Sequence, residues 1–184
     1  MDIARTINCD VLVVGGGNAG LIAAIEAKNR GASVTLIEKG PKESRGGNSR
    51  FSGGTFRIAF DDEKDILPLF EGSNLRWEEI EIEPFTRDDF FNSIMRVTKG
   101  LAAKNLTEIY INGSLETAIW IKKQGIEWAL NYEHGFKKDG NYIWPKGTNF
   151  LMNPGSGEGL VEQEYSILDK LGVDVLYKTA ARSL

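Results

Sequence analysis

The residues that decide the fold are Gly15-Gly16-Gly17-Asn18-Ala19-Gly20, which stand between an apolar run, 10–14, and an Ala-rich run, 21–30. This order predicts a strand, a tight turn and a helix. The spacing is G-x-G-x-x-G, in which the first glycine lets the chain turn sharply and the second lets a pyrophosphate approach the backbone. The third glycine lets the helix pack closely on the sheet, and the N–H groups of the first helical turn then face the phosphates.

One acidic residue strengthens this prediction. A second apolar run, 33–37, ends at Glu38. A carboxylate about 20 residues beyond such a turn accepts hydrogen bonds from a ribose 2′-hydroxyl, and it would repel a 2′-phosphate. The pattern therefore indicates an adenine dinucleotide without a 2′-phosphate. An ordinary βαβ unit with a glycine-rich turn, and a dehydrogenase that uses NAD alone, remain alternatives.

Composition excludes several classes of protein. The chain has 184 residues, a net charge of −4 and one cysteine, Cys9. No basic patch stands out, so a nucleic-acid partner is not expected. A single cysteine excludes an internal disulfide framework and fits a reducing compartment. No apolar run approaches the roughly 20 residues of a membrane helix, and the N-terminus lacks the apolar core of a signal peptide. We therefore expect a cytoplasmic protein with no membrane span.

A glycine-rich stretch follows the second strand. Residues 40–55 contain two Gly-Gly pairs separated by Ser, Asn and Arg. Bare backbone N–H groups, hydroxyl groups and cationic charge suit a ligand-binding loop. A flexible surface loop of similar composition is the alternative.

The run from Cys9 to Gly54 resembles the FAD-binding segment of the fumarate reductase/succinate dehydrogenase flavoprotein family. It is most similar to the branch that includes tricarballylate dehydrogenase. The glycine turn, the Glu38-Lys39 pair and the sequence Arg-Gly-Gly-Asn-Ser at 45–49 carry the resemblance. Looser similarity continues at 90–98, 120–128 and 157–177.

The resemblance implies a cofactor site that is spread over the glycine turn, the end of the second strand and the following loop. It implies that the pyrophosphate is held by Gly15, Gly17, Asn18, Ala19 and Gly20. It implies that the adenosine ribose is held by Glu38, with Lys39 beside it. It implies that the stretch from pyrophosphate to flavin is lined by Arg45, Gly46, Gly47, Asn48, Ser49, Ser52, Gly53 and Gly54, and that Ala180 and Ala181 lie near the adenine.

The same resemblance implies the mode of cofactor binding. Relatives with covalent flavin carry a histidine in this loop, and residues 44–55 contain none. The expected cofactor is therefore non-covalent FAD. We assign no catalytic residue and no metal ligand, and His134, the only histidine, receives no role because no partner is identifiable in the sequence.

The predicted fold class is α/β, a Rossmann-like FAD-binding domain with a parallel sheet and a helical insertion. We expect one FAD-binding domain over residues 1–184, with 8–55 and 155–184 as the dinucleotide-binding core and 56–154 as a helical and loop insertion. Family enzymes run to more than twice this length. The resemblance therefore implies an N-terminal fragment, with the substrate-capping domain and the C-terminal part missing.

The pattern within the core predicts five elements: strands at 8–14, 33–38 and 173–177, and helices at 18–30 and 160–171. The first two strands should run parallel, because a right-handed crossover joins them.

The expected insertion contains mainly helices. Thr86 begins a capping box, Asn105 and Ser114 are expected to cap two further helices, and Gly125 should end the second. A hairpin turn is expected at 138–141. The acidic residues before Pro84 are expected to form an exposed, extended connector.

The resemblance implies an FAD-dependent oxidoreductase that exchanges hydride between flavin N5 and a C–C bond next to a carboxylate. Succinate, fumarate or a tricarballylate-type acid is the implied substrate, and an electron-transfer partner is implied beside it. Two alternatives stay open, a ketosteroid-type dehydrogenase of the same superfamily and a non-catalytic FAD-binding remnant.

Overall fold

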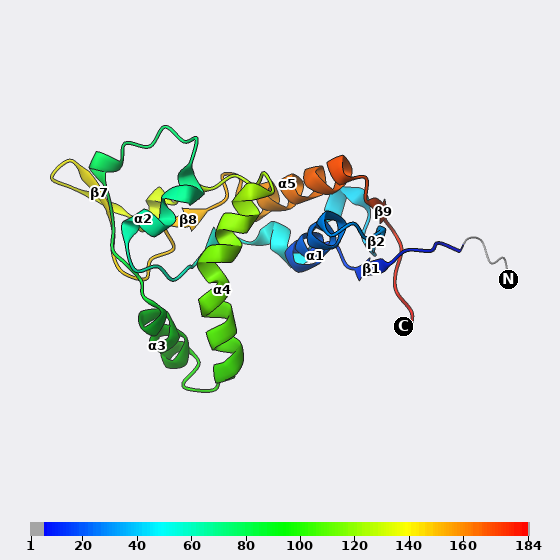
Figure 1. Cartoon of the computed structure of the whole chain (residues 1–184), viewed down its shortest axis with the longest axis horizontal. Helices are drawn as coiled ribbons and strands as arrows, with labels where there is room; N and C mark the ends of the chain where they lie inside the picture. Colours follow the sequence, from blue (N-terminus) through cyan, green and yellow to red (C-terminus); the bar gives the residue numbers. More distant parts are fainter. Residues whose placement is uncertain (1–5, 184) are drawn as a thin grey trace. The chain divides into compact units, whose positions relative to one another are not determined.

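The computed structural model describes residues 6–183, which form two compact units (Figure 1). Unit 1 comprises residues 6–54 and 155–183, and unit 2 comprises residues 55–154. Unit 1 contains a parallel sheet with helices, so the predicted α/β fold class is confirmed.

The sheet of unit 1 has three parallel strands in the order β1-β2-β9. Their bounds are Val11–Val14 for β1, Val34–Ile37 for β2 and Asp174–Leu176 for β9. Val11 pairs with Val34, and Thr35 pairs with Asp174. The parallel pairing of the first two strands was predicted and is confirmed. Each strand is shorter than its apolar run, because the ladder of paired residues begins only at Val11, Val34 and Asp174.

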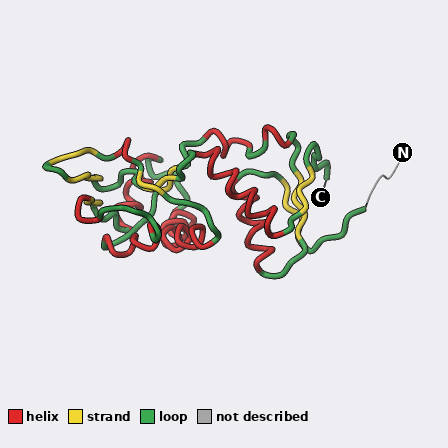
Figure 2. The backbone as a smooth tube through the Cα atoms, turned by 90° about the horizontal axis from the view of Figure 1, so that it is seen from above, coloured by secondary structure: helices red, strands yellow, loops and turns green. Residues whose placement is uncertain are grey.

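Two helices, α1 (Asn18–Asn29) and α5 (Ser156–Leu171), pack against each other on one side of this sheet (Figure 2). α1 connects β1 to β2, and α5 leads into β9. Because crossovers between parallel strands are right-handed, connections that run in the same direction along the sheet place their helices on the same side. Leu21, Ile25 and Leu168 are fully buried. The other face at β1 is less covered, since Leu12 and Val14 are about half exposed (49% and 52%).

The loop after β2 is more regular than the sequence indicated. It contains two 3₁₀ helices, η1 (Lys42–Ser44) and η2 (Gly47–Phe51). A Cβ on Gly157 would stand 2.1 Å from the Ser49 carbonyl oxygen, and one on Gly46 would stand 2.7 Å from Val161 Cγ1. Glycine is therefore required where the loop and α5 meet.

Unit 2 contains two small three-stranded sheets, of which the prediction of a helical and loop insertion included only the hairpin at 138–141. The first has the order β3-β8-β5, with β3 at Thr55–Phe56, β8 at Leu151–Met152 and β5 at Ala129–Leu130. The second has the order β4-β7-β6, with β4 at Ile80–Ile82, β7 at Asn141–Trp144 and β6 at Phe136–Lys138. These strands are too short to show a clear alternation of apolar and polar residues.

Two predictions for this part of the chain had different outcomes. The hairpin is confirmed: β6 and β7 are antiparallel, and Asp139 and Gly140 have φ values of 50° and 96°. The exposed connector is wrong, because Ile80 and Ile82 are buried in the second sheet and only the glutamates beside them are exposed. The apolar side chains on alternate residues, and not the net charge, determine that this segment forms a buried strand.

Two longer helices of unit 2 are α3 (Arg87–Val97) and α4 (Lys104–Lys123). The capping box at α3 is confirmed, since the Asp89 N–H donates to Thr86 Oγ1 and Asp89 accepts from the Thr86 N–H. The expected caps at Asn105 and Ser114 are wrong, because one continuous helix follows Ala103. The Ser114 hydroxyl donates to the Ile111 carbonyl inside that helix, which satisfies it without a break.

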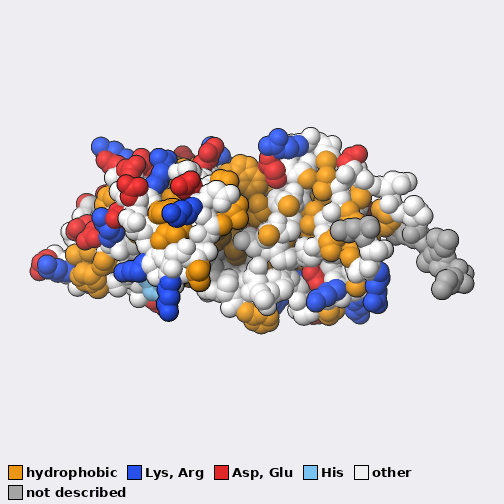
Figure 3. Space-filling model, turned by 90° about the horizontal axis from the view of Figure 1, so that it is seen from below, with side chains coloured by type: hydrophobic (Ala, Val, Ile, Leu, Met, Phe, Trp, Pro, Cys, Tyr) orange, Lys and Arg blue, Asp and Glu red, His pale blue; other side chains and the backbone are white. Residues whose placement is uncertain are grey.

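The shorter helices of unit 2 are α2 (Glu63–Ile66), η3 (Leu67–Phe70), η4 (Trp77–Glu79) and η5 (Tyr132–His134). Gly125 has φ +100° just after α4, which confirms the predicted stop. Within residues 6–183, no helix combines the length and apolar character that a membrane crossing needs. On the face drawn in Figure 3, acidic and basic side chains are interspersed.

Candidate functional site

The glycine turn joins β1 to α1, and its geometry gives the first and last glycines separate roles. Gly15 has φ +99°, a conformation that residues with a Cβ rarely adopt, and its N–H donates to the Ile37 carbonyl at 2.8 Å. A Cβ on Gly20 would stand 2.1 Å from the Gly15 carbonyl oxygen and 3.3 Å from Val13 Cγ1. Gly20 therefore allows the close approach of helix and strand that the sequence pattern predicts.

The N-terminus of α1 leaves polar groups available for a ligand. Gly17 is the N-cap residue and has no side chain to cap the helix. The Asn18 N–H donates to Ser49 Oγ at 3.0 Å, whereas the N–H groups of Ala19 and Gly20 have no partner among residues 6–183. Asn18 Oδ1 is also buried without a hydrogen-bond partner in this part of the chain. Free N–H groups at a helix N-terminus favour a bound anion such as a phosphate.

Glu38 lies directly beside this turn. Its Oε2 accepts a hydrogen bond from the Gly16 N–H at 2.8 Å, and its Oε1 accepts one from the Gly40 N–H at 2.7 Å. A carboxylate has about four lone-pair sites, so both oxygens can still accept from a ribose hydroxyl. The acid at the end of the second strand and the glycine turn therefore form one site.

Tyr165 supports the turn from α5, and the sequence did not single it out. Its buried hydroxyl donates to the Gly16 carbonyl at 3.1 Å. Burial is the main cause that raises the pKa of this hydroxyl, so it stays a hydrogen-bond donor at neutral pH. The guanidinium of Arg45 stacks over the Tyr165 ring, 4.1 Å from its centre.

Arg45 is engaged with side chains of α5 and of the segment after β9. Its Nε donates to Glu162 Oε1 at 3.2 Å, and its Nη1 donates to the Tyr177 hydroxyl at 2.9 Å. The hydrogen bond from Arg45 lowers the pKa of the Glu162 carboxyl, and Glu162 raises the pKa of Arg45. The guanidinium therefore anchors the loop to the fold, and its predicted contact with the cofactor stays a prediction. Residues 117 positions apart gave no sequence signal for this ion pair.

A second arginine strengthens the same connection. Arg50 of η2 pairs with Glu158 and lies 3.7 Å from Glu162 Oε1. Glu158 and Glu162 are four residues apart on α5, and such residues project from the same side of a helix. This spacing was the available signal that α5 faces the arginine-rich loop.

The other predicted cofactor residues fall into two groups. Gly46 and Ser49 lie against the turn, since a Cβ on Gly17 would stand 3.5 Å from the Gly46 carbonyl oxygen and 3.4 Å from Ser49 Oγ. The Thr179 N–H donates to the Glu38 carbonyl at 2.9 Å, which brings the segment before Ala180 alongside the acid.

The second group consists of residues that the structure does not gather around the turn by any described polar side-chain contact. They are exposed and comprise Lys39, Gly47, Asn48, Gly53 and Ala180. Ser52 and Gly54 contact α5 instead: the Ser52 carbonyl accepts from the Gly157 N–H, and a Cβ on Gly54 would stand 2.5 Å from the Ser156 carbonyl carbon. Their roles toward the cofactor stay predictions.

No cluster of metal-ligating side chains occurs among the described residues. His134 is exposed on η5, in unit 2. The Cys9 thiol is free and partly exposed.

The residues around the turn fit an adenine dinucleotide. Two N–H groups are free at the start of α1, Asn18 Oδ1 is buried without a partner among the described residues, and Glu38 stands beside them. A Cβ on Gly17 would meet Ser49 Oγ at 3.4 Å, so the glycine keeps the backbone at the start of the helix uncovered by a side chain of its own. These are the donor and acceptor types that a pyrophosphate and a ribose require.

Comparison with known proteins agrees with this geometry. Residues 10–184 match the family model described as FAD binding domain. The vinyl phenol reductase of Lactiplantibacillus plantarum is 28% identical over 185 residues, covering 100% of this chain and 32% of that protein. The cytochrome-type fumarate reductase of Shewanella frigidimarina is 40% identical over 70 residues, covering 38% of this chain and 12% of that protein.

A solved structure shares the fold. It is the 3-ketosteroid Δ1-dehydrogenase of Sterolibacterium denitrificans, with a TM-score of 0.71 at 15% identity, over 97% of this chain and 42% of that one. The chain thus spans about a third of the length of the vinyl phenol reductase it matches. Because the family model extends over nearly the whole sequence, the chain belongs to the FAD-binding domain family of flavoproteins that includes fumarate reductases, and its cofactor is FAD.

Proposed function

We propose that this chain is the FAD-binding part of an oxidoreductase that acts on a C–C bond next to a carboxylate. When bound, FAD supplies hydride transfer at its N5 atom. The observation that carries the cofactor part of this proposal is the hydrogen bond from the Gly16 N–H to Glu38 Oε2, at 2.8 Å, and the resemblance supports the C–C chemistry. The site as described accounts for holding the adenosine and pyrophosphate half of the cofactor.

The residues of this chain would act by binding and orientation. The free N–H groups of Ala19 and Gly20 would donate to the pyrophosphate, and Glu38 would accept from the ribose hydroxyls. Tyr165 and Arg45 would keep the turn in place from behind. We expect non-covalent binding, because the loop that carries the histidine in covalent relatives has none here.

The finer proposal concerns substrate and setting. The resemblance to tricarballylate dehydrogenase-like proteins supports a small di- or tricarboxylate as substrate, with succinate, fumarate or a tricarballylate-type acid as examples. We propose an electron-transfer partner on the same basis. A single cysteine supports a reducing compartment, for which we propose the cytoplasm.

Titration of the purified chain with FAD tests the cofactor site. We expect flavin absorbance near about 450 nm to stay with the protein through gel filtration. Glu38→Gln should weaken FAD binding by about tenfold or more, because a charge-assisted hydrogen bond is lost. Glu43→Gln, a change of the same kind on the exposed η1, should leave the affinity unchanged. NAD binding without FAD binding would contradict the proposal.

Substrate assays separate the remaining alternatives. Reduction of an added dye on supplying succinate or tricarballylate would support the carboxylate proposal. Reduction with a 3-ketosteroid alone would favour the ketosteroid-type alternative. Bound FAD without turnover on any of these substrates would favour the non-catalytic alternative.

A further inference from the structure

Unit 2 contains a cavity of about 500 Å³ that the FAD site does not use. Its walls come from three separate segments: the residue after β3, α3 with a residue shortly before it, and the turn after β7. The lining residues are Arg57, Phe85, Asp89, Asn92, Ser93, Arg96, Val97, Lys146 and Gly147. Cavities of this volume commonly hold small organic ligands.

One polar stripe of α3 faces this cavity. Asp89, Asn92, Ser93 and Arg96 are spaced three, four and seven residues from the first, so they lie on one side of the helix. The exposed Arg96 guanidinium has no hydrogen-bond or ion-pair partner among the described residues. It is therefore available to a ligand.

Arg57 enters the cavity from the opposite segment and is held in place by its neighbours. Its Nε donates to Asn149 Oδ1 at 3.1 Å, and its guanidinium carbon lies 5.8 Å from the centre of the Phe85 ring and 6.0 Å from that of Phe90. Its two terminal nitrogens have no partner in the described part of the chain. A guanidinium fixed through its Nε presents a planar pair of donors that matches a carboxylate.

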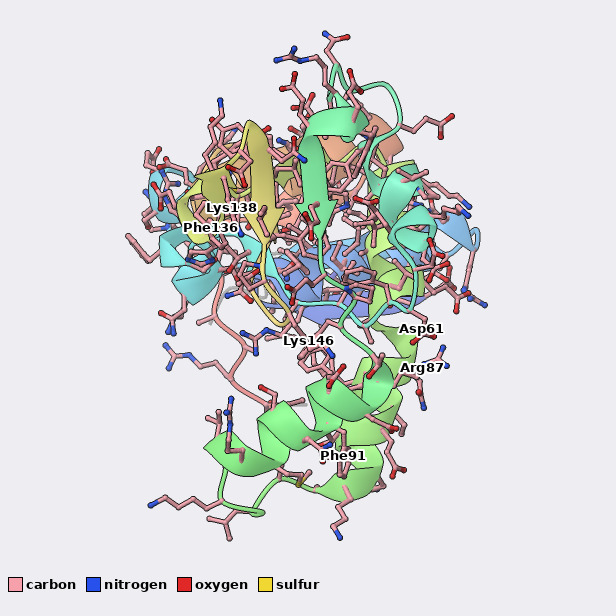
Figure 4. The ribbon with its side chains drawn as sticks, turned by 90° about the vertical axis from the view of Figure 1, so that its left-hand side faces the viewer. Asp61, Arg87, Phe91, Phe136, Lys138 and Lys146 are labelled. Atoms are coloured by element: carbon pink, nitrogen blue, oxygen red, sulfur yellow. The ribbon has the colours of Figure 1, made fainter. Side chains whose placement is uncertain are left out.

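Lys146 completes the cationic lining and is positioned by α3. Its Nζ lies 3.1 Å from Asp89 Oδ2, and its N–H donates to Glu83 Oε2 at 2.8 Å. Figure 4 shows Lys146 next to α3, whereas Arg87, the first residue of α3, lies at a different side. Hydrogen bonds from Thr86, and then Lys146, lower the pKa of the Asp89 carboxyl, so it stays ionised. The cavity thus has three cations and one carboxylate, a net charge of +2 in a chain whose net charge is −4.

The floor of the cavity favours a ligand with a carbon skeleton. Phe85 is buried and supplies an aromatic surface. Gly147, at φ +77°, passes so close that a Cβ there would stand 3.1 Å from Phe85 Cε2. A cavity with an aromatic floor and cationic walls suits an organic anion better than a hydrated metal ion or a free phosphate.

We infer that this cavity is a binding site for a small organic di- or tricarboxylate, with Arg57 and Arg96 as the main ligand-binding groups and Lys146 as a third. This site lies in unit 2 alone. Its ligand belongs to the class proposed above for the substrate, but binding in this cavity requires neither FAD nor turnover. The single carboxylate of the lining is already paired with Lys146, so both arginines remain for the ligand.

Isothermal titration of the whole chain with succinate and with citrate tests this inference. Arg96→Gln and Arg57→Gln should each weaken binding by about fivefold or more, since each removes a charge-assisted hydrogen bond. Arg87→Gln removes the same charge from α3 outside the cavity and should change the affinity by less than about twofold. Near-ultraviolet circular dichroism checks that each variant is folded, and Arg96→Gln is the safer variant because Arg96 is exposed.

Further titrations decide the chemistry of the ligand. Dimethyl succinate should not bind, inorganic phosphate should bind more weakly than succinate, and 0.5 M salt should weaken succinate binding. Equal losses in Arg87→Gln and Arg96→Gln, or equal binding of phosphate and succinate, would overturn the inference. Succinate binding that persists in Glu38→Gln, while FAD binding is weakened, would show that the cavity of unit 2 and the proposed FAD site bind their ligands independently.

Discussion

The two units gather their polar groups in different ways. In unit 1 the site consists largely of backbone: glycine N–H groups, the bare start of α1 and one acid from the next strand. In unit 2 the cavity is lined by charged side chains from segments almost 90 residues apart, from Arg57 to Lys146. A backbone site needs a fixed spacing of residues in one stretch, whereas a side-chain site needs only that the fold bring residues together. The first kind can be read from sequence, and the second kind cannot.

Glycine-to-alanine substitutions in the two units give the largest expected effect that tests this difference. Gly20→Ala places a Cβ 2.1 Å from the Gly15 carbonyl oxygen and should lower the free energy of unfolding by about 3 kcal/mol. Gly113→Ala, in the middle of α4, meets only Thr117 Oγ1 at 3.8 Å and should stabilise the chain by up to about 1 kcal/mol. Urea unfolding measures both. Equal stability of Gly20→Ala and the parent chain would contradict the close approach in unit 1.

Buried carboxyl groups give the next largest expected effect. Glu164 of α5 is fully buried, has no hydrogen-bond partner among the described residues, and desolvation raises its pKa to about 8. The unfolded chain releases the Glu164 proton at a lower pH than the folded chain does. The contribution of the protonated carboxyl to stability is therefore complete below about pH 4.5 and is lost as the pH rises toward 8. Glu164→Gln should therefore raise the free energy of unfolding by about 2 kcal/mol at pH 8 and leave it unchanged at pH 4.5.

Glu63 of unit 2 is the residue with which Glu164 is compared. Burial, followed by the nearby Asp62 and Glu81, raises the pKa of Glu63, which is only partly buried. Glu63→Gln should show the same sign of pH dependence with a smaller amplitude, because solvent screens the group. Chemical unfolding at several pH values compares the two variants. A larger effect at Glu63 would reverse the comparison.

Tyr165 sharpens the contrast, because it is a side chain that supports the backbone site. Tyr165→Phe removes the hydrogen bond to the Gly16 carbonyl and keeps the ring under Arg45, so it should cost about 1 kcal/mol of stability. The FAD affinity should fall by about threefold, since the turn is less firmly held. Tyr142→Phe in unit 2 is the control and should leave FAD binding unchanged. Thermal unfolding and FAD titration provide the two measurements.

Helix caps give the smallest expected difference. Thr86→Ala removes the side-chain cap of α3 and should lower the free energy of unfolding by about 1 kcal/mol, with no change in FAD affinity. Thr117→Ala, on the exposed side of α4, should change stability by less than about 0.5 kcal/mol. A loss of FAD affinity in Thr86→Ala would show that the cap matters beyond its own helix.

The sequence predicted most of unit 1 because its signals are local. The turn, both helices and the parallel pairing followed from Gly15 to Gly20 and the apolar runs, although α5 begins at Ser156, before the predicted start at residue 160. The partners of Arg45 were beyond reach, since Glu162 is 117 residues away and either residue could have faced solvent. Tyr165 looked like one more apolar residue of a helix until its hydroxyl was placed against Gly16.

Unit 2 was less predictable for physical reasons that its residues show. Ser114 was expected to begin a new helix, but a Cβ on the preceding Gly113 would meet only Thr117 Oγ1, at 3.8 Å, and the Ser114 hydroxyl bonds within α4. Ile80 and Ile82 alternate with glutamates, and their burial depended on β7, which lies about 60 residues later. Strands of two to four residues gain their stability from such distant partners and leave little pattern in the sequence.

The discontinuity of unit 1 has a consequence for how the chain emerges from a ribosome. Unit 2 is one uninterrupted stretch, and all of its contacts can form once residue 154 is available. Unit 1 must wait for α5 and β9, and pairing β9 with β2 closes a loop of about 140 residues, from Thr35 to Asp174, at an entropic cost that grows only slowly with length. Until then β1, β2 and the glycine turn lack Tyr165 and the pairing with β9, so the nascent chain completes the surroundings of this turn only after unit 2 has emerged.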